Sequence, residues 1–538
     1  MAASSRNIFN RQRLLQVVRG ITKPLHHESS QLSIKKEQNG STCYKCFPLE
    51  ARHIEHVSAT NPFAPSPHDF HKAICDKIKE AKERVYLASL YIGPAVDKVK
   101  YHREAELLEC LKKVSSSEHP VDIKILLDLN RALRPVPIAD KEHSPYESNE
   151  DSITSAEACF RALRQTSDGS TTRTNRDEDR KIYLLSALQS FWQRVLPNPY
   201  NEAMGVFHIK VYIVDDSLIL SGANLSEEYF VDRHDRYLQI KEGGNGLVDF
   251  YADLVKVMCE HAPEYEGDRK GKGYNNTLQF DDFLDSISKV VMTDDCNNPP
   301  QVKDLDQEQT EVVAIAVPTF QAPPRFGQSD SLRSDVQTIC EMVQETSEQD
   351  RSSVLRMASA YLNPTESFLK ACDGLQWAHF LTAGYVSHGF KPKKKAGNKG
   401  RVWIPAVFHE LSRQLSSEKF LVWLYQRESW TFHAKGLWLT IRESLGDKVT
   451  HDPPNYAIPD DSDLVAVTHG SGNFGERSEK RDLESNLVLL FPPKSPLADF
   501  HKEEWNEMES HAEHFSKGKG VSLSPAFKMA LPAIRSFF

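Results

Sequence analysis

Short apolar runs alternate with longer amphipathic stretches along the chain. The runs "RVYLASLYIGP" (84–94) and "VDIKILLDLNRA" (121–132) each end at turn residues. Runs of this length and composition are typical of buried strands. Helical patterns lie nearby, for example at 69–83. Strands that alternate with helices predict an α/β fold.

The same pattern occurs a second time in the C-terminal half of the chain. The matched segments are 84–94 with 354–364, 121–132 with 376–389, and 207–216 with 432–440. In each pair the apolar residues and the turn that follows them correspond, and the order along the chain is the same. The sequence therefore predicts two duplicated α/β domains, each a mixed β-sheet flanked by helices.

Polar stretches without periodicity separate these regions and indicate loops and linkers. They set the expected boundaries of the folded parts. The expected segments are a poorly ordered lead-in (31–64), a first domain (65–292), a linker (293–310), a second domain (311–515) and a C-terminal amphipathic segment (516–538).

A histidine and a lysine stand two residues apart on one predicted strand of each half. Residues i and i+2 of a strand point to the same face. His208 and Lys210 therefore share a face in the first half, as His433 and Lys435 do in the second. A lone pair of this kind is common on protein surfaces. Two copies with matched surroundings predict one site shared by both halves.

Each pair is followed by a turn of small residues that ends in an asparagine. The first turn ends in Asn224, and the second contains Ser471 and ends in Asn473. Small residues let the backbone approach a ligand, and a helix that begins after the turn suits an anion. Asp235 and Glu484 each lie 11 residues beyond the asparagine. A carboxylate at matched spacing is a natural partner to orient an imidazole.

These residues resemble the phospholipase D superfamily, in which a His-x-Lys motif occurs twice. The first copy has the full pattern, which ends in Asp215, whereas the second has Thr440 at the corresponding place. The stretches "VYLASLYIGP", "LSGANLSEEYF" and "DRHDRYLQI" are similar to the eukaryotic phosphatidyltransferases within that superfamily. The resemblance implies two phospholipase D-like domains related by a pseudo-twofold axis, with the active site at their interface.

The resemblance also implies a reaction. A histidine attacks the phosphorus of CDP-diacylglycerol that carries the diacylglycerol. Glycerol 3-phosphate then accepts the phosphatidyl group, which gives phosphatidylglycerophosphate and CMP. The resemblance implies no metal ion and no cofactor. The substrates CDP-diacylglycerol and glycerol 3-phosphate are thus the expected partners.

The implied roles fall on the paired motifs. The catalytic residues are His208, Lys210, Asp215, His433 and Lys435; Asn224, Asn473 and Ser471 stabilise the phosphate; Asp235 and Glu484 orient the imidazoles. By resemblance His208 is the nucleophile and His433 the general acid and base. Asp215 is expected only to support the site, because the second copy lacks its counterpart.

Composition adds limits to this picture. The chain has 538 residues and a net charge of −9, and it contains no apolar run of about 18 residues. No membrane-spanning helix is predicted, so a lipid substrate has to be met at a membrane surface. The acidic balance argues against nucleic acid as a partner. Nine scattered cysteines predict reduced thiols rather than a disulfide framework.

The first 30 residues have their own pattern. They contain several arginines and no acidic residue before Glu28, and apolar residues between 14 and 21 could form one face of a helix. This is typical of a mitochondrial transit peptide, with a disordered basic tail as the alternative. In either case the segment is expected to stay outside the fold. With the resemblance, it predicts a peripheral protein on the matrix side of the mitochondrial inner membrane.

Two segments could meet an anionic membrane surface. Residues 391–400 carry five lysines and either gather anionic headgroups or form a solvated loop. The apolar C-terminal stretch 523–538 either contacts a membrane or docks on the domain. Tyr91 and Tyr361 occupy matched places, where core packing is favoured over a pocket wall.

The motif alone leaves the acceptor of the reaction open. Water would make the chain a phospholipase D-type hydrolase, and serine would make it a phosphatidylserine synthase. A phosphodiesterase that acts on nucleic acid is disfavoured by the net charge of −9. A lipid-binding scaffold without activity is disfavoured by the intact histidines and lysines in both halves. The oligomeric state and the acyl-chain preference stay open.

Overall fold

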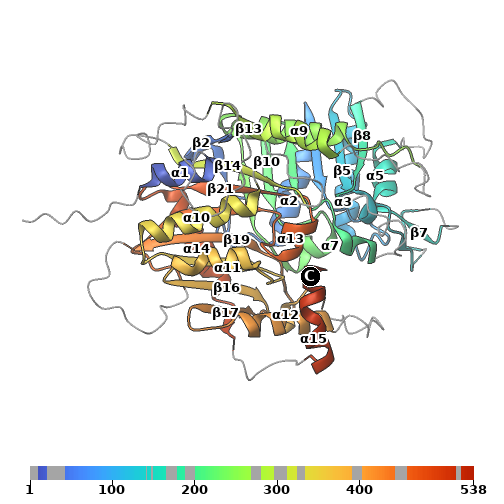
Figure 1. Cartoon of the computed structure of the whole chain (residues 1–538). Coiled ribbons are helices and arrows are strands. Elements are labelled where there is room, and N and C mark those ends of the chain that lie inside the picture. The colour runs from blue at the N-terminus through green and yellow to red at the C-terminus, as the bar shows by residue number, and fades with distance from the viewer. Residues whose placement is uncertain are drawn as a thin grey trace, which may run out of the picture.

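The structure is a computed structural model, and it describes residues 10–20, 43–140, 142–146, 150–164, 179–187, 200–267, 280–295, 312–323, 334–390, 403–442, 457–515 and 523–537. The two halves form two α/β domains that lie against each other (Figure 1). In Figure 1 the cyan-to-green elements of the first domain occupy the upper right. The yellow-to-red elements of the second domain occupy the lower left.

The first domain contains a seven-stranded mixed sheet. In spatial order its strands are β3 (Ile54–Glu55), β12 (Tyr237–Ile240), β10 (Ser217–Ser221), β9 (Val211–Val214), β4 (Arg84–Ser89), β5 (Asp122–Asp128) and β8 (Arg180–Leu185). Neighbours from β4 to β8 are parallel, and the pairs from β3 to β4 are antiparallel.

The second domain contains a nine-stranded mixed sheet. Its strands are β2 (Phe47–Glu50), β14 (Val312–Gln321), β21 (Glu484–Leu490), β20 (Ser462–Gly470), β19 (Lys435–Arg442), β15 (Val354–Ser359), β16 (Trp377–Ala383), β17 (Phe420–Tyr425) and β22 (Ala512–His514). Neighbours from β15 to β17 are parallel, and the other pairs are antiparallel.

Six strands hold equivalent places in the two sheets. The order β12-β10-β9-β4-β5-β8 in the first sheet corresponds to β21-β20-β19-β15-β16-β17 in the second, with the same parallel and antiparallel pairs. The segments matched in the sequence lie on equivalent strands, since β4 matches β15 and β9 matches β19. The predicted duplicated α/β fold is confirmed.

Helices cover the sheets of both domains. Those of the first are α2 (Pro67–Glu80), α3 (His102–Ser115), α4 (Leu129–Ala132), α5 (Ser155–Arg164), α7 (Glu227–Val231), α8 (Leu247–Glu260) and α9 (Phe280–Val291). Those of the second are α10 (Asp335–Gln349), α11 (Glu366–Ala371), α12 (Trp403–Leu415), α13 (Glu476–Arg481), α14 (Pro496–Glu509) and α15 (Pro525–Ile534). Short pairs join β1 (Cys43–Tyr44) to β13 (Met292–Thr293), β6 (Val136–Pro137) to β7 (Ser152–Ile153), and β11 (Arg233–His234) to β18 (Thr431–Phe432).

Helix α2 illustrates how local sequence sets these elements. Ser66 caps its N-terminus by accepting from Asp69 N at 3.2 Å, and the Asp69 carboxylate accepts from Ser66 N at 2.9 Å. This reciprocal capping satisfies two backbone donors that the first helical turn leaves unpaired. Apolar residues at helical spacing then bury one face. Phe70 stacks on Tyr237 of β12, with 4.5 Å between the ring centroids, which fixes α2 on the sheet.

The hydrophobic core joins the two domains. Along β4, Val85 and Leu87 face a core beneath α2 and α3, whereas Ala88 faces the opposite side of the sheet. On that side the core continues through α8 into the second domain, where it includes Val317 of β14. The shared apolar core therefore holds both sheets in one fixed relation.

The N-terminal helix departs from the prediction. Helix α1 (Arg11–Arg19) was expected to stay outside the fold, but it packs on α10 and buries Leu14, Leu15, Val17 and Val18. Arg11 forms an ion pair with Asp463 at one end of the helix. The apolar face that suggests an import signal also matches an apolar surface of the second domain. Burial of that face explains why the expectation was wrong for residues 10–20.

The lead-in was also expected to be poorly ordered. From residue 43 onward it has defined structure instead, because β2 pairs with β14 of the second sheet and β3 pairs with β12 of the first. This segment therefore links the edges of both sheets.

Seven of the described cysteines are free thiols. Cys43 is disulfide-bonded, which the expectation of reduced thiols missed.

The C-terminal helix α15 lies beside α12 (Figure 1). Its residue Leu531 is 2% exposed, whereas Met529 is 84% exposed, so one face docks and the other is open. The lysine-rich segment 391–400 and most of the expected linker 293–310 lie outside the described residues. Within the described ranges, no helix is both long enough and apolar enough to span a bilayer.

The docking of α1 predicts a stability effect. Replacing Leu15, which is 1% exposed, with alanine should lower the free energy of unfolding by about 2–5 kcal/mol, because the methyl groups leave a cavity. Gln16→Ala is the matched control, since Gln16 is exposed on the same helix. Chemical denaturation of the full chain measures both variants. Equal stability of the two would contradict the docked helix.

Candidate active site

Two backbone contacts bring the His-x-Lys motif of one half beside the carboxylate region of the other. At the first, β11 pairs in parallel with β18, and His433 N donates to His234 O at 2.8 Å. At the second, His208 N donates to Leu483 O at 2.9 Å. His234 and Leu483 each immediately precede a carboxylate. These contacts therefore set each histidine beside the carboxylate of the other half.

The first pair joins His208 to Glu484. His208 Nδ1 lies 3.0 Å and 3.1 Å from the two carboxylate oxygens of Glu484. Ser478 Oγ donates to Glu484 Oε1 at 2.7 Å and fixes the carboxylate from the other side. The side chain of Glu484 is 1% exposed, whereas that of His208 is 12% exposed. His208 therefore lies at the edge of the site that solvent can reach.

The second pair joins His433 to Asp235. His433 Nδ1 lies 2.6 Å from Asp235 Oδ2, and both side chains are almost fully buried. Arg236 N donates to the other carboxylate oxygen at 2.9 Å. A carboxylate that accepts from Nδ1–H holds the ring in one orientation and leaves Nε2 for chemistry.

Each lysine donates to the backbone oxygen of its own motif histidine, and Lys435 Nζ also lies 2.7 Å from His433 Nδ1 and 3.7 Å from Asp235 Oδ2. Lys210 Nζ donates to His208 O at 2.6 Å, and Lys435 Nζ donates to His433 O at 2.8 Å. Burial lowers the pKa of Lys210 to about 7 and that of Lys435 to about 8. The charges of Lys435 and Asp235 act on the pKa of Lys210, which reflects their closeness across the interface.

Gly222 shows how closely the halves approach. A Cβ atom at this residue would lie 2.6 Å from Lys435 Nζ and 2.6 Å from Asp235 Oδ1. Any larger residue would push the lysine of the second domain away. The small-residue turn of the first half is therefore needed because the cation of the second half lies against it.

The pKa values of the site favour neutral imidazoles before substrate binds. Burial, and then the nearby lysine, lower the pKa of His433 well below its usual value. Burial lowers the pKa of His208, although Glu484 opposes this. Burial alone would raise the pKa of Glu484, but His208 and Lys210 hold it below its usual value. Burial raises the pKa of Asp235. An arriving anion favours the charged imidazole and raises its pKa.

The three residues that were expected to stabilise the phosphate, Asn224, Asn473 and Ser471, have different surroundings. Asn224 Nδ2 donates to Tyr229 OH at 3.0 Å. The Oδ1 atoms of Asn224 and Asn473 are buried and have no partner among the described residues. Ser471 Oγ accepts from Ser485 N at 3.2 Å, so its hydroxyl supports the backbone beside Glu484. A direct phosphate contact of Ser471 stays a prediction.

The structure does not bring Asp215 to the site. It lies at the far end of β9, where its carboxylate accepts from the backbone N–H groups of Lys82, Glu83 and Arg84 at distances from 2.8 to 3.3 Å. Thr440, its counterpart, donates to Val354 O at 3.2 Å at the start of β15. Both residues therefore attach the motif strand to the start of a neighbouring strand, which is β4 for β9 and β15 for β19.

Two residues near His433 were not predicted from the sequence: Tyr229, which contacts the imidazole, and Arg233, whose charge lowers the pKa of His433. Tyr229 OH lies 3.4 Å from His433 Nε2, and the two rings meet edge to face. The Arg233 guanidinium lies 4.4 Å from the Tyr229 ring centroid and is 2.6 Å from Glu228. Both lie between Asn224 and Asp235 in the sequence. Tyr229 has a serine at the matched place in the second half, so comparing the copies for differences could have found it.

The matched tyrosines differ in their surroundings. The Tyr361 ring lies 6.0 Å from the His433 ring, so it forms part of the site wall as well as packing on α12. Tyr91 lies beneath the guanidinium of Arg131, and its hydroxyl is 3.0 Å from Ser226 Oγ.

One buried trio among the described residues has the composition of a metal site: His469, His501 and Glu504. Arg236 donates to Glu504 at 2.7 Å and to His469 Nε2 at 2.9 Å. A guanidinium already supplies the positive charge at this place. The trio therefore fits an ion-pair network between the domains better than a metal centre.

The chain is similar over most of its length to named proteins. It is 26% identical to the human "CDP-diacylglycerol–glycerol-3-phosphate 3-phosphatidyltransferase, mitochondrial", with 91% of this chain and 84% of that protein covered. It is 26% identical to the "Probable CDP-diacylglycerol–glycerol-3-phosphate 3-phosphatidyltransferase" of Dictyostelium discoideum, with 86% of this chain and 75% of that protein covered. No family model matches the chain.

Among solved structures, the fold matches the phosphatidylserine synthase of Haemophilus influenzae with a TM-score of 0.62. The match covers 92% of this chain and 97% of that chain at 18% identity. The two proteins therefore share their fold. The resemblance to the eukaryotic phosphatidyltransferases, inferred from the paired motifs, is confirmed by the relatives named for that activity.

The buried lysines predict that the site binds anions less tightly as pH rises. Their pKa values are lowered to about 7 and about 8, so both lose charge as pH rises through this range. Tungstate should therefore bind more weakly at pH 9 than at pH 6.5, as measured by calorimetry. Lys435→Met should weaken binding at pH 6.5 about tenfold or more.

Lys480→Met serves as the control, because Lys480 is exposed on α13 and pairs with Glu476. Its tungstate affinity should match that of the unmodified chain. An affinity that is equal in Lys435→Met and the control, or that rises with pH, would contradict the proposed anion site.

Proposed function

We propose that this chain transfers the phosphatidyl group from CDP-diacylglycerol to glycerol 3-phosphate, which releases CMP and gives phosphatidylglycerophosphate. One observation carries the proposal. The relatives named for this reaction match 91% of the chain, and that span includes both histidine–carboxylate pairs. The product is the precursor of phosphatidylglycerol and cardiolipin.

The first step forms a covalent intermediate. His208 Nε2 attacks the phosphorus that carries diacylglycerol, and the bond from this phosphorus to the bridging oxygen breaks. CMP leaves and takes a proton from His433. Glu484 holds His208 through Nδ1 and stabilises the charge that the ring acquires on bonding to phosphorus.

The second step reverses the roles of acid and base. The hydroxyl of glycerol 3-phosphate attacks the phosphatidyl-histidine, while His433 takes its proton and the phosphorus–nitrogen bond breaks. Lys210 and Lys435 stabilise the phosphoryl oxygens as negative charge develops, with Asn224 and Asn473 beside them. No step requires a metal ion.

Differences between the two halves support separate roles for the histidines. His208 has a serine beside its carboxylate and is 12% exposed, whereas His433 has Tyr229 against it and is 4% exposed. The more accessible imidazole suits the nucleophile. The enclosed imidazole suits proton transfer, because the site around it excludes water.

We further propose that the protein works in mitochondria, peripherally on the matrix side of the inner membrane. Relatives are named mitochondrial, and the N-terminus has the composition of an import signal. Because α1 is part of the core, we infer that processing leaves residues from Arg11 onward in place. The expected boundary of the transit peptide at residue 30 is replaced by this proposal.

A hydrolase and a phosphatidylserine synthase remain the alternatives, since the step that forms phosphatidyl-histidine is common to all three. The acceptor separates them. Purified chain should therefore be offered CDP-diacylglycerol in mixed micelles with glycerol 3-phosphate, serine or water alone. Phosphatidylglycerophosphate formed only with glycerol 3-phosphate is expected. Phosphatidylserine or phosphatidic acid as the main product would overturn the proposal.

The same assay tests the nucleophile. With labelled CDP-diacylglycerol and no acceptor, the unmodified chain should release a burst of CMP and retain the label on the protein after acid-free denaturation. His208→Ala should lose both signals. His119→Ala is the control, because His119 is an exposed loop residue. A labelled adduct in His208→Ala would show that another residue is the nucleophile.

The crossed pairing predicts which carboxylates matter. Glu484→Gln should lower kcat by about 10³-fold or more, because the amide favours the wrong tautomer and cannot stabilise the charged ring. Asp235→Asn should have an effect of the same kind through His433. Asp215→Asn should keep kcat within a few-fold, because Asp215 contacts backbone N–H groups away from the site. A larger loss in Asp215→Asn than in Glu484→Gln would contradict these assignments.

A further inference from the structure

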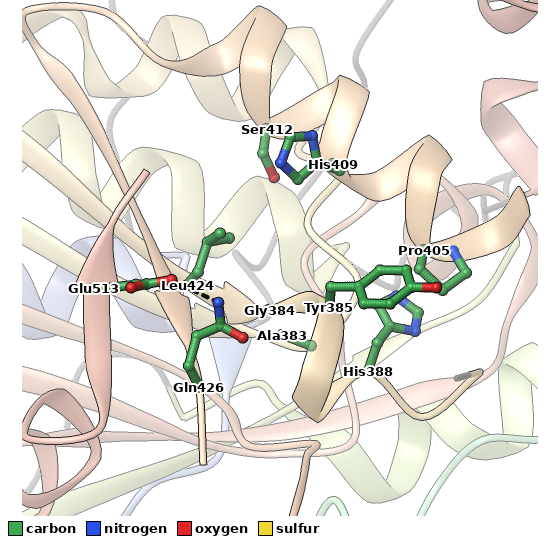
Figure 2. A pocket seen from close by; sticks show the side chains of 10 residues that line it. All are labelled: Ala383, Gly384, Tyr385, His388, Pro405, His409, Ser412, Leu424, Gln426 and Glu513. Atoms are coloured by element: carbon green, nitrogen blue, oxygen red, sulfur yellow. Dashed lines mark hydrogen bonds between the residues drawn. The ribbon is translucent and has the colours of Figure 1, made fainter. Parts of the chain in front are cut away.

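A cavity of about 280 Å³ lies at the carboxyl ends of β16 and β17, beneath α12 (Figure 2). Gly384 and Gln426 line it from the ends of the strands, and Tyr385 and His388 line it from the segment that follows β16. Crevices outside the carboxyl ends of parallel strands are common ligand sites in α/β folds. The catalytic roles proposed above do not use this cavity.

The cavity wall carries a buried hydrogen-bond acceptor without a partner. Gln426 Nε2 donates to Glu513 Oε1 at 2.6 Å, which fixes the amide so that its oxygen faces away from Glu513 (Figure 2). That oxygen, Gln426 Oε1, is buried and has no partner among the described residues. A Cβ atom on Gly384 would lie 2.6 Å from it, so the glycine leaves room for this orientation.

The wall also carries a buried donor. His388 is 1% exposed, and its Nδ1 accepts from Phe390 N at 3.2 Å. The ring proton therefore sits on Nε2, which has no partner among the described residues. Burial and the charge of Arg233 lower the pKa of His388 to about 4, so the ring is neutral and offers one donor. Buried polar atoms without partners are costly, so a ligand that paired with both atoms would gain affinity from them.

The cavity lies behind the His433 side of the site. The His388 ring is 5.8 Å from the ring of Tyr361, which in turn is 6.0 Å from the ring of His433. A Cβ atom on Gly389 would lie 3.3 Å from Tyr361 OH and 3.6 Å from Arg233 Nη2. One tyrosine ring thus separates the cavity wall from the histidine that is proposed to protonate the leaving group.

We infer that this cavity binds the cytosine base of the nucleotide part of the substrate. The inference rests on the proposed function, in which CMP leaves from the His433 side. Cytosine carries an amino group that can donate to Gln426 Oε1 and a carbonyl that can accept from His388 Nε2–H. Tyr385, which is 38% exposed, can stack on the ring.

The same polar pair excludes other occupants. Uracil has a carbonyl where cytosine has the amino group. The uracil oxygen and Gln426 Oε1 are both acceptors, so they cannot form a hydrogen bond with each other. A volume of about 280 Å³ is at the small end of ligand cavities, which suits a single-ring base. An acyl chain would leave both polar atoms unpaired.

The test is calorimetric titration of the full chain with CMP and with UMP. The unmodified chain should bind CMP at least tenfold more tightly than UMP. Gln426→Met and His388→Phe should each raise the Kd for CMP about tenfold or more, and Gln426→Met should reduce the preference for CMP over UMP. Gln414→Met is the matched control, because Gln414 is exposed on α12 and does not line the cavity. Its Kd should stay within twofold.

Tyr385→Ala is a second test that does not depend on the buried residues, because loss of an exposed ring is not expected to prevent folding. It should raise the Kd for CMP about fivefold or more while the melting temperature is unchanged. CMP binding that is equal in all cavity variants and the control would overturn the inference, as would no CMP binding by the unmodified chain. A change in acyl-chain preference without a change in CMP affinity would also overturn it.

The two proposals fail in different ways. If the chain binds CMP through Gln426 and His388 but makes no phosphatidylglycerophosphate, the proposed function fails and the base site stands. If it makes phosphatidylglycerophosphate and the cavity variants keep the unmodified Kd for CMP, the function stands and the base binds elsewhere.

Discussion

The crossed pairing of imidazoles and carboxylates is the constraint on which the rest of the molecule depends. His208 is held by Glu484 and His433 by Asp235, so neither half contains a complete histidine–carboxylate pair. Each contact needs an accuracy of a few tenths of an ångström between residues separated by about 200 or more positions in the chain. The two sheets therefore have to be locked together, and a loose interface would misalign both pairs at once.

Apolar and polar contacts together hold the two domains in place. The core runs from β4 through α8 to β14, and Arg236 of the first domain is buried in the second. Arg236 donates to Lys435 O and Thr468 O at 2.8 Å and also binds Glu504. A buried guanidinium is stable only where its donors are satisfied. Any slip between the domains would unpair these donors, so the network penalises the same movement that would misalign the histidines.

The sequence predicted the duplication and most of the residues that lie together between the two halves, because strand periodicity and matched spacing are local signals. It could not predict that Glu484 belongs to His208, since the pairing arises from the relation between the domains. Tyr229 was missed because only one copy carries it. Helix α1 was assigned outside the fold because its basic, apolar pattern fits an import signal, while the surface of α10 that covers it is remote in sequence.

The structural role of Asp215 and Thr440 affects how such domains can be recognised in other sequences. The third residue of the motif fastens one strand to its neighbour, through a carboxylate in one copy and a hydroxyl in the other. A search pattern that demands an acid at this position would recognise only one half of the present chain. A pattern built on His-x-Lys, the small-residue turn and a carboxylate 11 residues after the asparagine would recover both halves and would pass over isolated surface His-x-Lys pairs.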